Sequence, residues 1–86
     1  MTKIVTQVEG EGLESLLGQR VMLMCLNYIY DGTLTGINDT CVLLEDASIV
    51  YETGPFNTKG YSDAQKLHNK KWYVQRAAIE SFGPGK

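Results

Sequence analysis

Residues 13–47, LESLLGQRVMLMCLNYIYDGTLTGINDTCVLLEDA, decide the fold of this chain. The stretch opens with the apolar spacing of a short helix and continues as apolar runs interrupted by single glycines and one polar turn. Single glycines inside strand patterns mark bends or bulges. A helix followed by short, bent strands indicates a mainly β protein with a small, strongly bent barrel.

The beginning of this stretch predicts an N-terminal helix. Leu13, Leu16 and Leu17 fall at positions i, i+3 and i+4, which places them on one face of a helix. Gly18 follows directly and is suited to end the helix. We expect a helix of about two turns, preceded by a loose lead-in over residues 1–12.

Five strands are expected after the helix. The first, at residues 20–27, is apolar on both faces, so its second face should be covered by the helix, by a bent strand or by another subunit. The second, at residues 29–37, contains Gly32 and Gly36, which fit a strand that serves both sides of a barrel. The other three are expected at residues 41–51, 71–76 and 78–82, with a bend at residues 45–46 and a long loop at residues 54–69 before the fourth strand.

Two short motifs carry a family resemblance. The first is the longer one and consists of Leu13, Leu16, Gly18, Val21 and Leu23, then Tyr30-Asp31-Gly32-Thr33-Leu34, then Val42, Leu44 and Glu45-Asp46. The second is Val74-Gln75-Arg76-Ala77-Ala78-Ile79. With the order of helix and strands, they resemble the Sm-like family (Sm, LSm and the bacterial host factor Hfq) over residues 13–82, apart from the long loop. The resemblance implies an SH3-type five-stranded antiparallel barrel with an N-terminal helix. It also implies a homo-oligomeric ring of about five to seven subunits.

The resemblance implies an RNA-binding site in two parts, at the turn after the second strand and at the end of the fourth strand. The residues at these positions are Asn38, Asp39, Thr40, Cys41, Gln75 and Arg76. Asp39 or Thr40 stands where the family stacks a base, and Gln75 stands where it has an arginine. Arg76 has the stronger claim to a ligand, because a guanidinium both stacks on bases and pairs with phosphate. Taken without the resemblance, the same residues are a polar turn followed by a buried thiol, and a solvated strand end.

Charge is divided unequally along the chain. Residues 1–53 carry a net charge of −6 and residues 54–86 one of +4, which together give −2. The whole chain is therefore not a polycation that coats nucleic acid, and a site for a polyanion should lie in the second half. The long loop combines cations with aromatic rings, as single-stranded nucleic acid favours, although loops also collect solvated lysines. The candidate loop contacts are Lys59, Tyr61 and Lys66.

The cysteines and the histidine form no metal or catalytic pattern in the sequence. Cys25 and Cys41 lie in apolar runs, which favours buried, reduced thiols over a disulfide or a metal site. His68 is the only histidine, and no acid or nucleophile is evident as its partner. We therefore expect no enzyme activity, no metal and no cofactor.

The 86 residues predict a single domain, residues 1–86, that depends on a partner. A chain of this size buries roughly 60–65% of its unfolded surface, so a second subunit is a physical expectation. No apolar run approaches the ~18 residues of a membrane span, and residues 1–7 do not have the core of a signal peptide. We expect a cytoplasmic ring that does not contact membrane and that binds single-stranded RNA or scaffolds RNA–protein complexes. The alternative is a protein-binding ring or structural adaptor that does not bind RNA.

Overall fold

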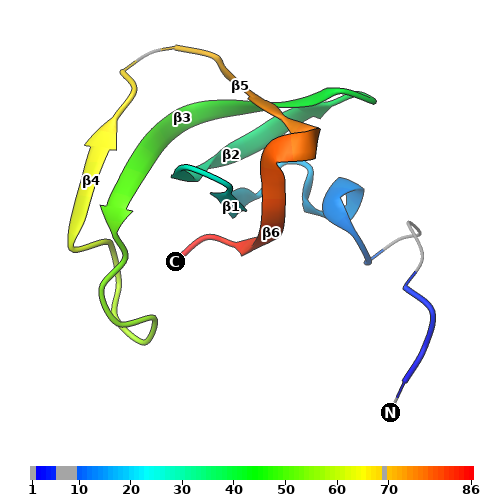
Figure 1. The fold of residues 1–86 in the computed structure, drawn as a ribbon, viewed down its shortest axis with the longest axis horizontal. Helices are drawn as coiled ribbons and strands as arrows, with labels where there is room; N and C mark the ends of the chain where they lie inside the picture. Colours follow the sequence, from blue (N-terminus) through cyan, green and yellow to red (C-terminus); the bar gives the residue numbers. More distant parts are fainter. Residues whose placement is uncertain (1, 6–9, 69) are drawn as a thin grey trace.

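The computed structural model describes residues 2–5, 10–68 and 70–86. They form one antiparallel sheet of six strands: β1 (Arg20–Cys25), β2 (Ile29–Ile37), β3 (Cys41–Glu52), β4 (Asp63–Lys66), β5 (Trp72–Gln75) and β6 (Ile79–Pro84). Two single 3-10 turns, η1 (Leu13–Leu16) and η2 (Arg76–Ala78), lie before β1 and between β5 and β6 (Figure 1). The described residues contain no α-helix.

The long strand β3 organises the sheet. The strand order is β4-β3-β2-β1-β6, and β5 also pairs with β3. β4 pairs with the second half of β3, where Ser48 faces Lys66, whereas β5 pairs with the first half, where Cys41 faces Gln75. The curvature of β3 is visible in Figure 1. Because both β4 and β5 lie along β3, one strand holds the two halves of the molecule together.

The prediction of a strongly bent five-stranded barrel was wrong, because the described residues form a six-stranded sheet that does not close. After β5, η2 turns the chain away from β3, and β6 then pairs with β1. Within the described residues no ladder joins β5 to β6, so the sheet is strongly curved but open. The additional strand, β4, lies in the segment predicted as a loop. All four of its residues are exposed, so it lacks the apolar alternation that would have revealed it.

The predicted two-turn helix is instead the single 3-10 turn η1. Gly12 precedes η1 and provides no side chain to cap it, and Gly18 follows with φ +85°. Too few residues remain between these glycines to extend a helical nucleus. Only one end of the predicted apolar face is in the core, since Leu13 is 5% exposed and Leu17 is 47% exposed.

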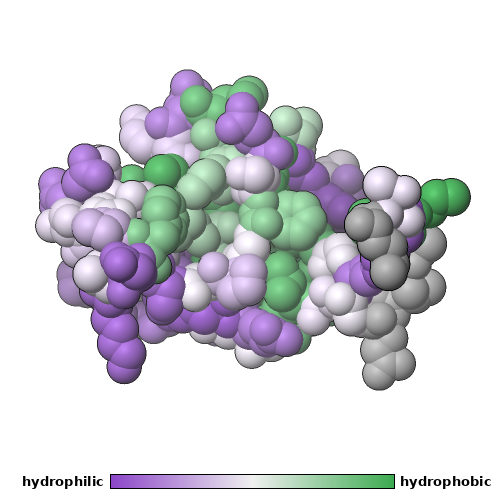
Figure 2. All heavy atoms as spheres, turned by 90° about the horizontal axis from the view of Figure 1, so that it is seen from below, coloured by the Kyte–Doolittle hydropathy of each residue, from purple (hydrophilic) through white to green (hydrophobic). Residues whose placement is uncertain are grey.

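The outer face of β1 is partly covered by this same chain. Met22 is buried, and it lines a groove of about 320 Å³ with Met24, Phe56 and Phe82. Residues 84–86 form another wall of this groove. Figure 2 shows one face of the molecule with apolar side chains gathered near its middle and hydrophilic side chains at the left. The helix, a bent strand and another subunit were each expected as a possible cover for the second face of β1. In the structure the end of β6 covers it, together with Phe56 from the loop before β4.

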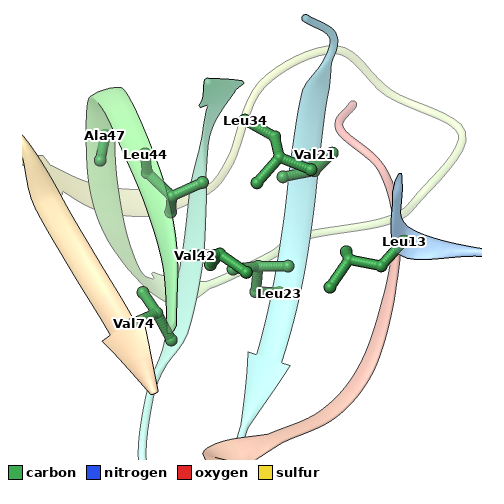
Figure 3. Close-up of a cluster of buried hydrophobic side chains, with 8 residues drawn as sticks. All are labelled: Leu13, Val21, Leu23, Leu34, Val42, Leu44, Ala47 and Val74. Carbon is green, nitrogen blue, oxygen red and sulfur yellow. The ribbon is translucent and has the colours of Figure 1, made fainter. Parts of the chain in front are cut away.

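The core lies on the concave side of the sheet, where side chains from β1, β2, β3 and β5 meet η1 (Figure 3). Its buried members are Leu13, Val21, Leu23, Leu34, Val42, Leu44, Ala47 and Val74. The predicted second strand matches β2, and the predicted bend in the third strand lies at Asp46, where φ is +52°. The first, fourth and last strands differ from their predicted ends by one or two residues. The expected lead-in is only partly described, because residue 1 and residues 6–9 lie outside the described ranges.

Gly32 offers a direct test of this packing. A Cβ placed on Gly32 would lie 3.2 Å from Ala47 Cα, Ala47 Cβ and Leu44 Cβ, which is too close for a well-packed core. We expect Gly32→Ala to lower the free energy of unfolding by roughly 1–3 kcal/mol in urea denaturation. Gly83→Ala in β6 is the matched control, because nothing lies within 4 Å of its Cβ position. Equal stability of the two variants would contradict the close contact of β2 with β3.

Candidate nucleic-acid interface

The turn between β2 and β3 is closed by the side chain of Asn38. Its Oδ1 accepts hydrogen bonds from the backbone N–H groups of Thr40 and Cys41, both at 2.8 Å, and from the Thr40 hydroxyl at 3.2 Å. Asn38 N also donates to Cys41 O at 3.0 Å. This Asx turn uses the side-chain oxygen of Asn38 and leaves Asp39 and Thr40 exposed at the tip.

Arg76 ties this turn to the end of β5. Its backbone N–H donates to Thr40 O at 2.9 Å, and its Nη1 donates to Asn38 O at 3.0 Å. Its Nη2 lies 3.5 Å from Glu14 Oε1 in η1. The structure therefore brings together the two parts of the predicted site. The guanidinium already has protein partners there, so a phosphate would compete with them.

Tyr73 stands between two grooves beside this turn. The first groove, of about 230 Å³, is lined by Tyr73 together with Asn38, Cys41 and Leu43. The second, of about 240 Å³, is lined by Tyr73 and by residues of the β1–β2 turn and of β5. Its polar and aromatic lining residues are Asn27, Tyr28, Tyr30 and Gln75. Tyr73 is 61% exposed, so its ring can be reached from solvent.

Tyr73 is predicted from the sequence to lie in a strand, but not to be a site residue. Val74 is buried at 5% exposure, so its neighbours Tyr73 and Gln75 point to the opposite, outer face of β5. The alternation of side chains along a strand is the sequence signal that could have identified Tyr73 as facing outward. The sequence predicted this strand at residues 71–76 but did not show which of its residues face the core, and the burial of Val74 in the structure decides that.

The prediction that both cysteines are buried was wrong, although both thiols are free. Cys25 and Cys41 are each half-buried. Cys41 lies on the outer face of β3, because the adjacent Val42 points into the core. Burial raises the pKa of the Cys25 thiol, which therefore stays protonated near neutral pH.

The candidate loop contacts do not join the turn and β5. Lys66 lies on β4, which pairs with β3 from Ser48 onward, whereas Cys41 begins β3. Ser48 lies seven positions after Cys41 along β3, which corresponds to roughly 20 Å of strand. Lys59 is exposed in the loop before β4, and Tyr61 packs under Lys86.

A cluster of charged side chains holds the bend of β3. Arg20 donates to Asp31 Oδ2 from Nε at 3.0 Å and to Asp46 Oδ2 from Nη1 at 2.9 Å. Lys66 Nζ donates to the other oxygen of Asp46. The hydrogen bonds from Lys66 and then from Arg20 lower the pKa of Asp46. Lys66 is thus part of this cluster and is engaged by protein groups.

Within the described ranges, no three His, Cys, Asp or Glu side chains lie close enough together to hold a metal ion. The helical segments of the same ranges are too short to cross a membrane. Comparisons with protein-family models, with curated proteins and with solved structures give no match to this chain.

Arg76 is expected to contribute to stability through its contacts with the turn. Arg76→Ala removes the bond to Asn38 O and the contact with Glu14, and we expect it to lower the free energy of unfolding by about 1 kcal/mol. Urea denaturation measures this change. Gln75→Ala is the control, because Gln75 is the exposed neighbour on β5. If Arg76→Ala has the same urea midpoint as the wild-type protein, the guanidinium does not stabilise the turn.

Proposed function

We propose that this chain is a divergent Sm-like protein that binds single-stranded RNA and acts as a ring of identical subunits. The observation that carries the proposal is the exposed ring of Tyr73, which lines one groove with Asn38 and Cys41 and a second groove with Gln75. We call the area formed by Tyr28, Tyr30, Tyr73, Gln75 and residues 38–41 the tyrosine surface.

The tyrosine surface supplies what the turn residues lack. Asp39 and Thr40 have no π face on which a base can stack, whereas Tyr73 and Tyr28 are 61% and 52% exposed. The rings of Tyr28 and Tyr30 lie 6.3 Å apart and are tilted by 55°. Stacking on exposed aromatic rings contributes roughly 1–3 kcal/mol per base and tolerates many sequences. The side chains of Asn27 and Gln75 line the same groove and offer hydrogen bonds to base edges.

Affinity in this proposal comes from repetition of the site. Each subunit has a net charge of −2, and Arg76 is the cation that contacts residues 38–41, whereas Lys70 and Lys71 line a groove with Glu45 and Asp46. One subunit should therefore bind RNA weakly. A ring presents the same surface several times, and each contact raises the effective concentration for the next.

The free edges of the sheet support assembly. β5 pairs with β3, β6 pairs with β1, and within the described residues neither has a strand on its other side. Unpaired edges of this kind are covered in many proteins by a second chain. Pairing of β5 on one subunit with β6 on the next would produce a closed ring if the repeated rotation returns to the first subunit.

Tyr73→Leu tests the RNA proposal. We expect it to weaken binding to short U-rich or A-rich RNA by roughly tenfold or more in a fluorescence titration, because a stacking surface is lost from every subunit. Tyr51→Leu is the matched control: Tyr51 is 54% exposed but lies near the other end of β3. Equal effects of the two variants would contradict the tyrosine surface.

The same titration distinguishes the second candidate function, a protein-binding ring or structural adaptor. This alternative is favoured by exposed apolar side chains that RNA does not require, such as Leu26 at 71% and Ile4 at 85% exposure. Absence of RNA binding by the wild-type protein at low salt would support the adaptor and end the RNA proposal.

The ring is tested by light scattering on the purified protein. A subunit of 9.6 kDa should assemble to a mass of about 50 to 70 kDa at micromolar concentration, as expected for about five to seven subunits. The mass should be unchanged in Tyr73→Leu, because the substitution keeps the backbone hydrogen-bonding groups of β5 and changes only a side chain on its outer face. A single-subunit mass would contradict the ring.

A further inference from the structure

A second candidate binding site, which we call the ammonium cage, lies in residues 53–61, the segment that leads into β4. The ammonium group of Lys86 donates hydrogen bonds to Thr53 O at 2.6 Å and to Gly60 O at 2.7 Å. The same nitrogen lies 5.4 Å from the centre of the Phe56 ring and 5.2 Å from that of the Tyr61 ring. Two carbonyl oxygens and two aromatic rings are groups that bind a primary ammonium ion.

The segment itself shapes this cage. Gly54 and Gly60 have φ of +68° and +72°, a region that other residues rarely adopt. A Cβ on Gly54 would also lie 2.5 Å from Ser62 Oγ. Thr58 donates to Pro55 O from its backbone N–H and from its hydroxyl, which closes the turn that carries Phe56. These contacts are all independent of Lys86.

Beneath the cage lie two buried polar atoms. Asp31 Oδ1 and the Tyr61 hydroxyl are both buried, and the Asp31 side chain is only 7% exposed. Gly85 lies directly against this carboxylate, since a Cβ at Gly85 would be 2.7 Å from Asp31 Oδ1. Burial, and then the charge of Asp31, raises the pKa of Tyr61 to about 12. The titration of Tyr61 thus reports whether residues 85–86 cover this place.

We propose that residues 53–61 form a binding site for a primary ammonium group, that Lys86 occupies it as an internal ligand, and that a lysine side chain of a partner protein is the ligand that replaces it. Release of Lys86 would also remove one wall of the groove between Met22, Phe56 and Phe82, so that this apolar area becomes accessible to the same partner. The proposal does not depend on RNA binding, because the tyrosine surface is built from other residues.

Binding of n-butylammonium chloride to Lys86→Ala tests the cage. We expect saturable shifts of the Phe56 and Tyr61 ring signals in NMR spectra of the variant. The wild-type protein should need at least several-fold more of the salt, because Lys86 competes at high effective concentration. n-Butanol, which lacks the charge, should cause no such shifts. Lys59→Ala, which removes an exposed lysine of the same segment, should behave as wild type.

The phenol of Tyr61 provides a second readout. In the wild-type protein its pKa should be about 12, and exposure of the phenol to solvent in Lys86→Ala should lower it toward the ordinary value of 10.0. A raised phenol pKa means that the folded state favours the neutral form, so this contribution to stability is lost as the pH rises from 10 toward 12. Lys86→Ala should lose less stability over this range.

Two results would overturn the proposal. Unchanged ring signals in Lys86→Ala with n-butylammonium would show that the segment is not an ammonium site. Equal binding by the wild type and by the variant would show that Lys86 is not its internal ligand. Circular dichroism of both proteins confirms that the sheet is intact during these measurements.

Discussion

The ion pairs of Arg20 across the bend of β3 are the interaction on which the rest of this structure depends. Arg20 on β1 holds the buried carboxylate of Asp31 on β2 and the carboxylate of Asp46, where β3 changes direction. A buried carboxylate without its partner is strongly destabilising, so Arg20 and Asp31 must remain together. Because these three strands are adjacent in the sheet, this contact keeps the bend of β3 in place.

The bend divides β3 into two halves with different neighbours. The first half pairs with β5 and lies next to the Asx turn, so it carries the tyrosine surface. The second half pairs with β4 and leads into residues 53–61, so it positions the ammonium cage. One strand therefore separates the two proposed sites and also fixes their relative position. Arg20 and Asp31 lie beside the ammonium cage, because Gly85 packs against both of them.

Arg76 illustrates why residue type alone does not establish a binding role. A guanidinium at the end of a strand suits phosphate recognition, yet Arg76 bonds to Asn38 O and lies beside Glu14. Tyr73 differs from Arg76 in the reverse sense. Its sequence position is that of a core aromatic residue, whereas its ring is exposed between two grooves. The proposed RNA surface therefore relies on tyrosine rings, with Arg76 serving first to join the turn to β5.

The sequence by itself determined the local elements whose patterns are strong. It predicted the exact bounds of β2, the bend at Asp46, the polar turn at Asn38 and the mainly antiparallel β character. It did not reveal β4, whose residues are all exposed, or the open gap between β5 and β6. Periodicity describes which face of a strand is apolar, and it contains no information on which strand lies alongside.

Only the tertiary structure decided the contacts between residues far apart in the chain. Lys86 reaches the carbonyl of Thr53 across 33 positions, and Arg76 reaches Asn38 across 38 positions. No local pattern encodes such pairs, because they arise when separate strands pack on one core. Residues 38–41 and 75–76 lie next to each other in the structure, and their role in RNA binding stays a prediction. The tyrosine surface and the ammonium cage became visible only when β5 and residues 85–86 were placed against the sheet.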